Sequence, residues 1–457
     1  MKIIILGAGQ VGSTVAQSLS TEANEITVVD RLPGLLKDLQ EHLDIRTVVG
    51  QASHPDVLID AGIEDADLIL AVTNSDETNM VACQIAHSMF HTPTRLARVR
   101  APDYLVHPEL FVPEAVPVDV LISPEKLVTT FIQHLIEQPG ALQILDFLDN
   151  RVQLVALCAE NGGPLVGKQL RNLGYRLPKV QLRVVAIFRR DRAIVPDGET
   201  VIEAEDEIFF LATHRDIHAV VAAFRPIDKP YHRIIIAGGG NIGKRLAELL
   251  ESRYRVKIVE RDPERCRHLA ASLRRTIVLH GDASDVGLAR GENFDQADVY
   301  CAVSNDDEVN ILSAMLAKRM GVRKTLAIIN RSRYVDLVQG SALDIALSPA
   351  QITIGAILTH IRRGDFVAVH SLRRGAAEAI EIVAHGDHKT SRVVGRCIDE
   401  IPLPEGTTVG AIARKEKVIF PRQDTVIESE DHIVVFLADK GKIAEVEKLF
   451  QVAVTYI

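Results

Sequence analysis

The strongest constraint in this 457-residue sequence is an internal duplication. The segment IIILGAGQVGSTVAQSL at 3–19 recurs at 234–250 as IIIAGGGNIGKRLAELL, with 8 of 17 positions identical. Further along, AVTNSDETN at 71–79 recurs at 302–310 as AVSNDDEVN, again displaced by 231 residues. Two segments that repeat in register indicate a duplicated domain rather than a chance match to a short motif.

A second pair of repeats follows the first. TVIEAEDEI at 200–208 matches TVIESEDHI at 425–433 at 7 of 9 positions. These regions are rich in β-branched residues with short turns, and each ends in a helix-like stretch, so we expect small α+β lobes. The segment 225–231, which contains two prolines, is the predicted link between the halves. The predicted domains are 1–123 and 232–348 for the two sheet domains, and 141–227 and 366–453 for the two lobes.

Short β-branched runs alternate with helical stretches in each copy. Lys2–Leu6 and Arg233–Ala237 are runs of the kind that is buried on both faces of a parallel sheet. The alternation predicts an α/β fold with two Rossmann-like doubly wound parallel-sheet domains, each followed by a small α+β lobe.

A Ser-Pro pair follows the last predicted strand of each sheet domain, at Ser123-Pro124 and Ser348-Pro349. Serine as N-cap with proline at the first helical position favours a helix start. Each predicted helix carries an apolar stripe with helical spacing. Two interpretations of the stripe remain open, because it could pack on its own sheet or on a partner subunit.

Composition excludes several classes of protein. A net charge of −9 makes the surface a poor match for nucleic acid or anionic lipid. The five cysteines contain no C-x-x-C pair, which argues for a reducing compartment and against a Cys-rich zinc site. No apolar run approaches the roughly 18–20 residues that span a bilayer, and the N-terminus has no signal-peptide pattern. We therefore expect a cytoplasmic protein with at most a peripheral membrane role.

Each copy carries a G-x-G-x-x-G motif between a strand and a helix. The first glycine makes a tight turn, the second lets the backbone approach a pyrophosphate, and the third lets helix and strand pack closely. The N–H groups at the helix start then hold the phosphates. The glycines are Gly7, Gly9 and Gly12 in the first copy and Gly238, Gly240 and Gly243 in the second.

An acid ends the second strand of each copy, Asp30 in the first and Glu260 in the second. A carboxylate at this position accepts hydrogen bonds from a ribose diol and repels a 2′-phosphate, which favours NAD(H) over NADP(H). NADH, NAD⁺, ATP and ADP all carry a free diol, so the acid does not choose among them. A P-loop lysine is absent, which argues against phosphoryl transfer of the P-loop kind.

Polar residues follow the next buried strand, Thr73-Asn74 in the first copy and Ser304-Asn305 in the second. They lie at the carboxyl edge, where an open sheet binds ligands, and could contact the ribose or adenine. An N-cap role for the helix that follows is equally open. Arg98 in the neighbouring strand could pair with a phosphate, whereas its counterpart Ile328 could not. The first site is therefore predicted to be better equipped for an anionic ligand.

The chain carries no evident catalytic or metal constellation. His87 and His91 are four residues apart on a probable helix, but without a third ligand they are interpreted as solvated histidines. A nicotinamide dehydrogenase normally adds a domain that presents the substrate and an acid/base group, and neither lobe offers one. A non-catalytic ligand-binding module is favoured, and the alternative is a soluble NAD-dependent oxidoreductase with a duplicated cofactor domain.

The segments GAGQVG, SHPDVL, AVTNSDETNM and TVIEAEDEIFFLA resemble the TrkA family of potassium uptake proteins, which have tandem RCK (KTN) domains. The resemblance covers essentially the whole chain. It implies a nucleotide-gated, NAD-binding regulatory subunit without enzymatic activity. Such a subunit would lie on the cytoplasmic side of the inner membrane and control a separate potassium pore subunit of the TrkH or TrkG type. It also implies self-association into a dimer or tetramer.

Carried over position by position, the resemblance also implies the residues that hold the nucleotide. The implied ligand is NAD(H), with ATP or ADP as a further candidate at the first site. The first site comprises Gly7, Ala8, Gly9, Gln10, Val11, Gly12, Asp30, Thr73, Asn74 and Arg98. The second comprises Gly238, Gly239, Gly240, Asn241, Ile242, Gly243, Glu260, Ser304 and Asn305.

Overall fold

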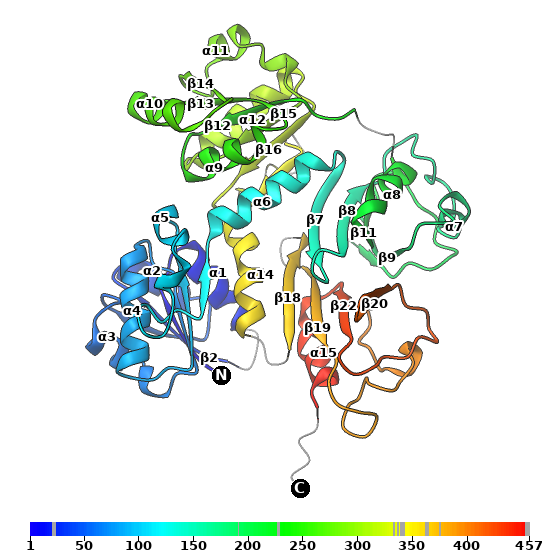
Figure 1. Cartoon of the computed structure of the whole chain (residues 1–457), viewed down its shortest axis with the longest axis horizontal. Helices are drawn as coiled ribbons and strands as arrows, with labels where there is room; N and C mark the ends of the chain where they lie inside the picture. Colours follow the sequence, from blue (N-terminus) through cyan, green and yellow to red (C-terminus); the bar gives the residue numbers. More distant parts are fainter. Residues whose placement is uncertain are drawn as a thin grey trace. The chain divides into compact units, whose positions relative to one another are not determined.

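The computed structural model describes residues 1–20, 24–190, 192–225, 229–331, 334–335, 338, 343–361, 365–373 and 376–452. Residues 226–228 of the predicted link, and the predicted domain limits 227 and 453, lie outside these ranges. The chain forms two compact units, coloured along the sequence in Figure 1. The first unit comprises Met1–Val128, Ile328–Val338 and Leu347–Ile361, and the second comprises Thr129–Ala327, Gln339–Ala346 and Arg362–Ile457.

The first unit contains a six-stranded sheet in the order β3-β2-β1-β4-β5-β6, with parallel neighbours throughout. This is the strand order of a dinucleotide-binding Rossmann fold, and the order reverses between β1 and β4. The strands are β1 (Lys2–Leu6), β2 (Glu25–Asp30), β3 (Arg46–Val49), β4 (Leu68–Ala71), β5 (Thr94–Arg98) and β6 (Val120–Ile122). The helices between them are α1 (Gln10–Leu19), α2 (Pro33–Gln40), α3 (Pro55–Asp60), α4 (Asp76–Ser88) and α5 (Pro102–Leu105).

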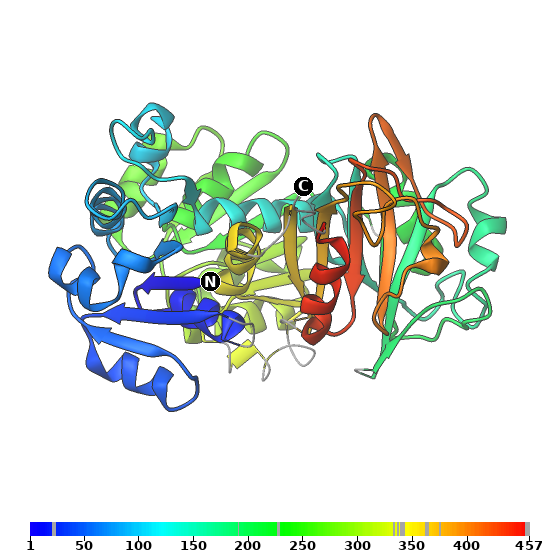
Figure 2. The ribbon, with the colours of Figure 1, turned by 90° about the horizontal axis from the view of Figure 1, so that it is seen from below.

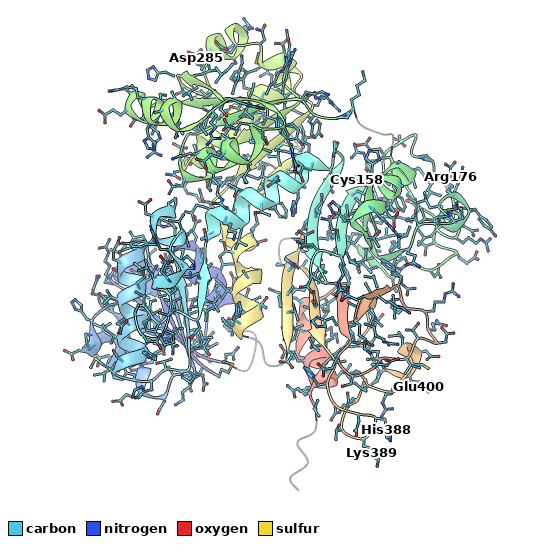
Figure 3. The ribbon with its side chains drawn as sticks, viewed as in Figure 1. Cys158, Arg176, Asp285, His388, Lys389 and Glu400 are labelled. Carbon is cyan, nitrogen blue, oxygen red and sulfur yellow. The ribbon has the colours of Figure 1, made fainter. Side chains whose placement is uncertain are left out.

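The second copy repeats this sheet, in the order β14-β13-β12-β15-β16-β17. Its strands are β12 (Arg233–Ala237), β13 (Arg255–Glu260), β14 (Ile277–His280), β15 (Val299–Ala302), β16 (Lys324–Ile328) and β17 (Ile345–Leu347). Its helices are α9 (Asn241–Leu250), α10 (Pro263–Ser272), α11 (Val286–Gly291) and α12 (Asp307–Met320). Asp285, labelled in Figure 3, caps α11 by accepting hydrogen bonds from the N–H groups of Gly287 and Leu288. The predicted pair of Rossmann-like domains is confirmed.

Each lobe is a five-stranded antiparallel sheet with short helices. The first has the order β10-β9-β11-β8-β7, and the second has the equivalent order read in reverse, β18-β19-β22-β20-β21. The elements of the first lobe are β7 (Ala141–Phe147), β8 (Val152–Cys158), α7 (Asn172–Arg176), β9 (Leu182–Arg189), β10 (Arg192–Ile194), β11 (Glu207–Thr213) and α8 (Ile217–Phe224). Those of the second are β18 (Phe366–Leu372), β19 (Ala377–Val383), β20 (Thr407–Arg414), β21 (Lys417–Ile419), β22 (His432–Leu437) and α15 (Ile443–Phe450). The predicted α+β lobes are confirmed.

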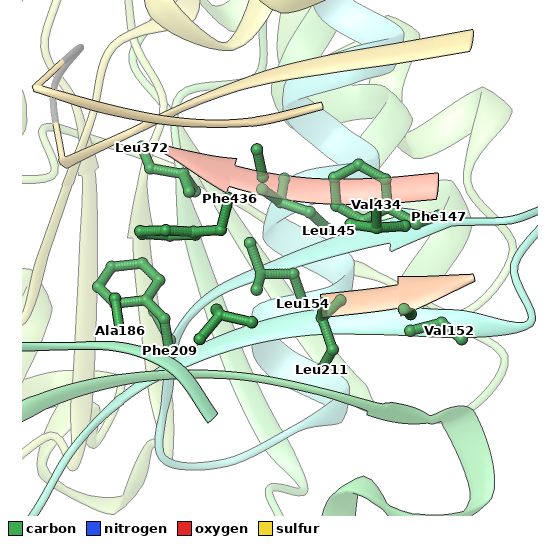
Figure 4. Packing of buried hydrophobic residues seen from close by; sticks show 14 of the residues in the cluster. Leu145, Phe147, Val152, Leu154, Ala186, Phe209, Leu211, Leu372, Val434 and Phe436 are labelled. Atoms are coloured by element: carbon green, nitrogen blue, oxygen red, sulfur yellow. The ribbon is translucent and has the colours of Figure 1, made fainter. Parts of the chain in front are cut away.

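The two lobes lie side by side (Figure 2) and share one apolar core inside the second unit (Figure 4). Phe209 and Phe436, one from each lobe, are fully buried with their ring centroids 5.6 Å apart. At the margin of this core Arg373 of the second lobe pairs with Glu207 of the first at 2.8 Å. Because a small sheet is marginally stable alone, burying one face of each lobe against the other stabilises both.

The helices that follow the Ser-Pro pairs, α6 (Pro124–Glu137) and α14 (Pro349–Ile361), begin at the predicted prolines. α14 packs on α1 and β6 of the first unit, although it follows the second sheet in sequence. The two interpretations of its stripe, packing on its own sheet or on a partner subunit, therefore both missed this contact. The physical reason lies in α1, which has no charged side chain and accepts the buried apolar residues of α14. None of the helices in the described ranges has both the length and the apolarity to cross a membrane.

Candidate functional site

The first glycine loop joins β1 to α1. Gly7 has φ +107°, a left-handed conformation that glycine adopts without strain. A Cβ added to Gly12 would lie 1.9 Å from the carbonyl oxygen of Gly7, so the loop and α1 can approach only because Gly12 has no side chain. At Gly9, by contrast, no atom of the described residues would lie within 4 Å of an added Cβ. The backbone therefore leaves open space at the glycine that a pyrophosphate is expected to approach.

The second loop, between β12 and α9, has the same geometry. Gly238 has φ +108°, and a Cβ on Gly243 would lie 1.9 Å from the Gly238 carbonyl oxygen. The duplicated motif therefore builds the same turn twice. The remaining predicted loop residues begin the helices. Gln10 and Asn241 are exposed at the first position of α1 and α9, Val11 is buried and Ile242 is half-buried.

The two strand-end acids hold their glycine loops through backbone hydrogen bonds. Asp30 accepts from the N–H of Ala8 at 2.7 Å and from the N–H of Leu32 at 2.9 Å. Glu260 accepts from the N–H of Gly239 at 2.8 Å and from the N–H of Asp262 at 2.9 Å. Each carboxylate oxygen can accept a second hydrogen bond, so this bracing is compatible with the predicted ribose contact.

Thr73 and Ser304 lie at the carboxyl edges of the two sheets, where each binds a buried asparagine. The Thr73 N–H and hydroxyl donate to Asn79 Oδ1 at 2.9 and 2.7 Å. The Ser304 N–H and hydroxyl donate to Asn310 Oδ1, also at 2.9 and 2.7 Å. The expected N-cap role is wrong for these residues, because α4 and α12 are capped by Ser75 and Asp306.

Arg98 ends β5 beside this edge. Its Nη2 donates to the Thr73 carbonyl oxygen at 2.5 Å, and its buried Nε has no hydrogen-bond partner within the described ranges. Burial lowers the pKa of Arg98, and the neighbouring charge of Arg100 lowers it further. A half-buried guanidinium whose Nε–H has no partner within the described ranges is well prepared to bind an anion. The equivalent position in the second copy is the buried, apolar Ile328.

Three further residues shape the first site and were missed in the sequence. Asn79 is fully buried and joins two strand ends, since its Nδ2 also donates to the Arg98 carbonyl oxygen at 2.9 Å. Asp76 accepts from the backbone N–H groups of Arg100 and Ala101, each at 2.8 Å. Arg100 in turn donates to the carbonyl oxygen of the exposed Asn74. The repeat itself held a signal, because Asp76 and Asn79 recur as Asp307 and Asn310.

The histidines that the structure describes do not form a metal site. No group of three or more His, Cys, Asp or Glu side chains that could hold a metal ion occurs within the described residues. His87 lies in the last turn of α4. Figure 3 shows His388 at the outer edge of the second lobe, in an exposed turn.

Comparison with known proteins identifies relatives of the whole chain. The TrkA-N domain model matches residues 3–124 and 234–349, and the TrkA-C domain model matches 157–225 and 388–451. The Trk system potassium uptake protein TrkA of Halomonas elongata is 58% identical over 456 residues, covering 100% of both chains. The protein of the same name from Vibrio alginolyticus is 55% identical and covers 99% of both. The crystal structure of the GsuK RCK domain has a TM-score of 0.62 at 19% identity, covering 98% of this chain and 94% of that one, which supports the fold.

Proposed function

The chain belongs to the family of the Trk system potassium uptake protein TrkA, and on this premise we propose that it is a regulatory subunit of a potassium uptake system. The observation that carries the proposal is the pairing of two glycine loops of the same geometry with two lobes that resemble each other. A nucleotide bound at the loops regulates such an assembly by binding one of its conformations more tightly than another. Coupling between sites of this kind is typically about 1–3 kcal/mol.

The proposal makes the protein a ligand sensor without enzymatic activity. The acids at the loops accept hydrogen bonds from backbone N–H groups, and the two lobes pack together around one apolar core. The partner is a separate membrane pore subunit of the TrkH or TrkG type, and the protein lies peripherally on the cytoplasmic side of the inner membrane. It associates with further copies of itself. The names of the relatives support the potassium system as the setting.

The proposed ligand is NAD(H) at both loops, with ATP or ADP as an alternative at the first. The structure of the GsuK channel bound to NAD shares the fold at a TM-score of 0.62 and 18% identity, covering 98% of this chain and 78% of that one. In the proposed sites the phosphates lie on the loop N–H groups, with Gly9 and Gly240 beneath them. Asp30 and Glu260 accept from the ribose, and the edges at Thr73 and Ser304 lie beside it.

Deleting the gene is expected to abolish potassium uptake through the pore subunit at low external potassium, because the pore would lose its nucleotide-dependent regulator. Uptake of ⁸⁶Rb⁺ in cells that retain the pore subunit measures this. The wild-type gene should restore uptake, whereas a Gly9→Ala/Gly240→Ala variant, in which both loops are blocked, should restore uptake that no longer follows the nucleotide. Normal uptake in the deletion strain, or steady NADH oxidation by the purified protein with a small substrate, would contradict the proposal.

Arg98→Ala is expected to weaken ATP binding at the first site by about tenfold, because a charge-assisted hydrogen bond is lost. Calorimetric titration of the full chain measures the affinity of each site. The affinity for ADP should fall less than that for ATP, since ADP carries less negative charge. Ile328→Ala is the matched control and should leave first-site binding unchanged. Equal losses for ATP and ADP would show that Arg98 does not act through phosphate charge.

A further inference from the structure

The second copy has Ile328 where the first has Arg98, but another cation lies beside its glycine loop. The Nη1 atom of Arg265 lies 3.6 Å from the position that a Cβ on Gly240 would occupy. Gly240 is the middle glycine, which a pyrophosphate approaches most closely. In the first copy the equivalent space at Gly9 is open within the described residues.

Arg265 is held over the loop by the packing of its helix. It lies on α10 one turn before Leu269, so the two side chains share a helix face. Leu269 is buried, and its Cδ1 lies 2.4 Å from where a Cβ on Gly239 would be. α10 can therefore sit this close only because position 239 is glycine. The first copy has Ala8 at this position.

The start of α10 is also firmly fixed. The Asp262 side chain accepts from the N–H groups of Glu264 and Arg265 at 2.8 and 3.0 Å. Asp262 is tied in turn to the loop, because its own N–H donates to Glu260, which also accepts from Gly239. The equivalent helix α2 has no side-chain cap. The Arg265 backbone is therefore anchored to the loop over which its side chain lies.

The surroundings of the second loop are basic where those of the first are not. Lys244 on α9 reaches across to α10, with its Nζ 3.4 Å from His268 Nε2. The counterparts of Lys244, Arg265 and His268 in the first copy are Ser13, Leu35 and Asp38. The copy without the strand-edge arginine thus carries basic side chains on the helices around its loop, at positions where the first copy has none.

We propose that Arg265 is the phosphate-binding cation of the second site and that it binds the pyrophosphate of a nucleotide from the α10 side of the loop. The inference rests on the proposed function of the loops as nucleotide sites. It makes both sites competent for an anionic ligand, with the positive charge supplied from opposite sides: from the end of β5 in the first and from α10 in the second. The second site should therefore follow its own order of nucleotide affinities.

The test uses the full chain with the Gly9→Ala change, so that titration with NADH or ADP reports the second site. Arg265→Ala should weaken the binding of both nucleotides by about tenfold and reduce the dependence of affinity on salt. Arg265→Lys should recover part of the loss. Arg267→Ala removes the same charge from the opposite face of α10, where Arg267 lies beside Glu264, and should leave the affinity unchanged. Because Arg265 is exposed, the thermal midpoint without ligand should not move.

The outcomes separate this inference from the function on which it rests. Binding that Gly240→Ala abolishes but Arg265→Ala leaves unchanged would overturn the inference alone. Equal weakening by Arg265→Ala and Arg267→Ala would also overturn it, because the effect would then be one of general charge. If no nucleotide binds in the Gly9→Ala background, both the inference and the proposed second site fail.

Discussion

Gly9→Ala is expected to reduce nucleotide affinity at the first site by at least about tenfold while leaving the protein folded. The structure separates the effect on nucleotide binding from the effect on folding. An added Cβ at Gly9 would meet no atom of the described residues within 4 Å, so the methyl group fits the unliganded loop. It would occupy the space that a pyrophosphate needs in order to reach the N–H groups at the start of α1. Isothermal titration with NADH measures the loss, and circular dichroism monitors the fold.

Gly12→Ala is the informative comparison, because the same methyl group would there lie 1.9 Å from the Gly7 carbonyl oxygen. This variant should lower the thermal stability of the first unit as well as its affinity. A Gly9→Ala protein that binds NADH as tightly as wild type would remove the first loop from the proposed site.

Arg189→Ala is expected to destabilise the first lobe by about 3–5 kcal/mol, because it removes the cation that pairs with a buried carboxylate. Asp206 is fully buried, and the Arg189 guanidinium donates to both of its oxygens at 2.8 Å. The same guanidinium donates to the carbonyl oxygen of Val201 at 2.7 Å, which ties the β9 strand to the turn before β11. Hydrogen exchange of the β8 and β11 amides in the full chain measures the local free energy of opening.

The double variant Arg189→Ala/Asp206→Ala should recover part of this loss, since it leaves no uncompensated charge. Lys37→Ala is the exposed control. It removes an exposed ion pair of α2 whose N···O distance is 3.8 Å, and the loss of stability should be below about 1 kcal/mol. Arg414→Ala should reproduce the Arg189 result in the second lobe, where Arg414 pairs with the fully buried Asp431. Unchanged exchange in β11 of the Arg189→Ala protein would show that solvent replaces the guanidinium.

The duplication made most of the fold predictable from sequence. A strand, a glycine turn and an acid after the next strand recur with the spacing that a Rossmann sheet requires, and the predicted strands Lys2–Leu6 and Arg233–Ala237 match β1 and β12. The contacts of α14 could not be predicted in the same way. The apolar stripe of α14 shows only that one face of the helix is apolar. Its neighbour is the surface of α1, which lies more than three hundred residues earlier in the chain.

The candidate site was predictable where backbone geometry dictates the residue. Gly7 and Gly12 are required by a left-handed turn and by a close approach, and both requirements follow from the motif. Side chains that bind across the sheet edge were harder to find. Asn79 lies in a helix, where within one copy its amide looks like that of a solvated residue, and only its recurrence as Asn310 in the second copy distinguishes it. Arg265 was also missed, because its proposed role depends on how closely α10 packs on the loop.

The packing of α14 on the first unit has a consequence for how the protein is made. The sheet of the first unit is complete in the chain by β6, yet the helix that covers α1 ends only at Ile361. At the usual rate of translation, the roughly 230 residues between Val128 and Ile361 take about 10–50 s to leave the ribosome. Throughout that interval the nascent first unit exposes the face that α14 will cover, which is a natural contact for a chaperone. A chain that stops after the first lobe never acquires this helix, so the amino-terminal half expressed alone is an incomplete unit.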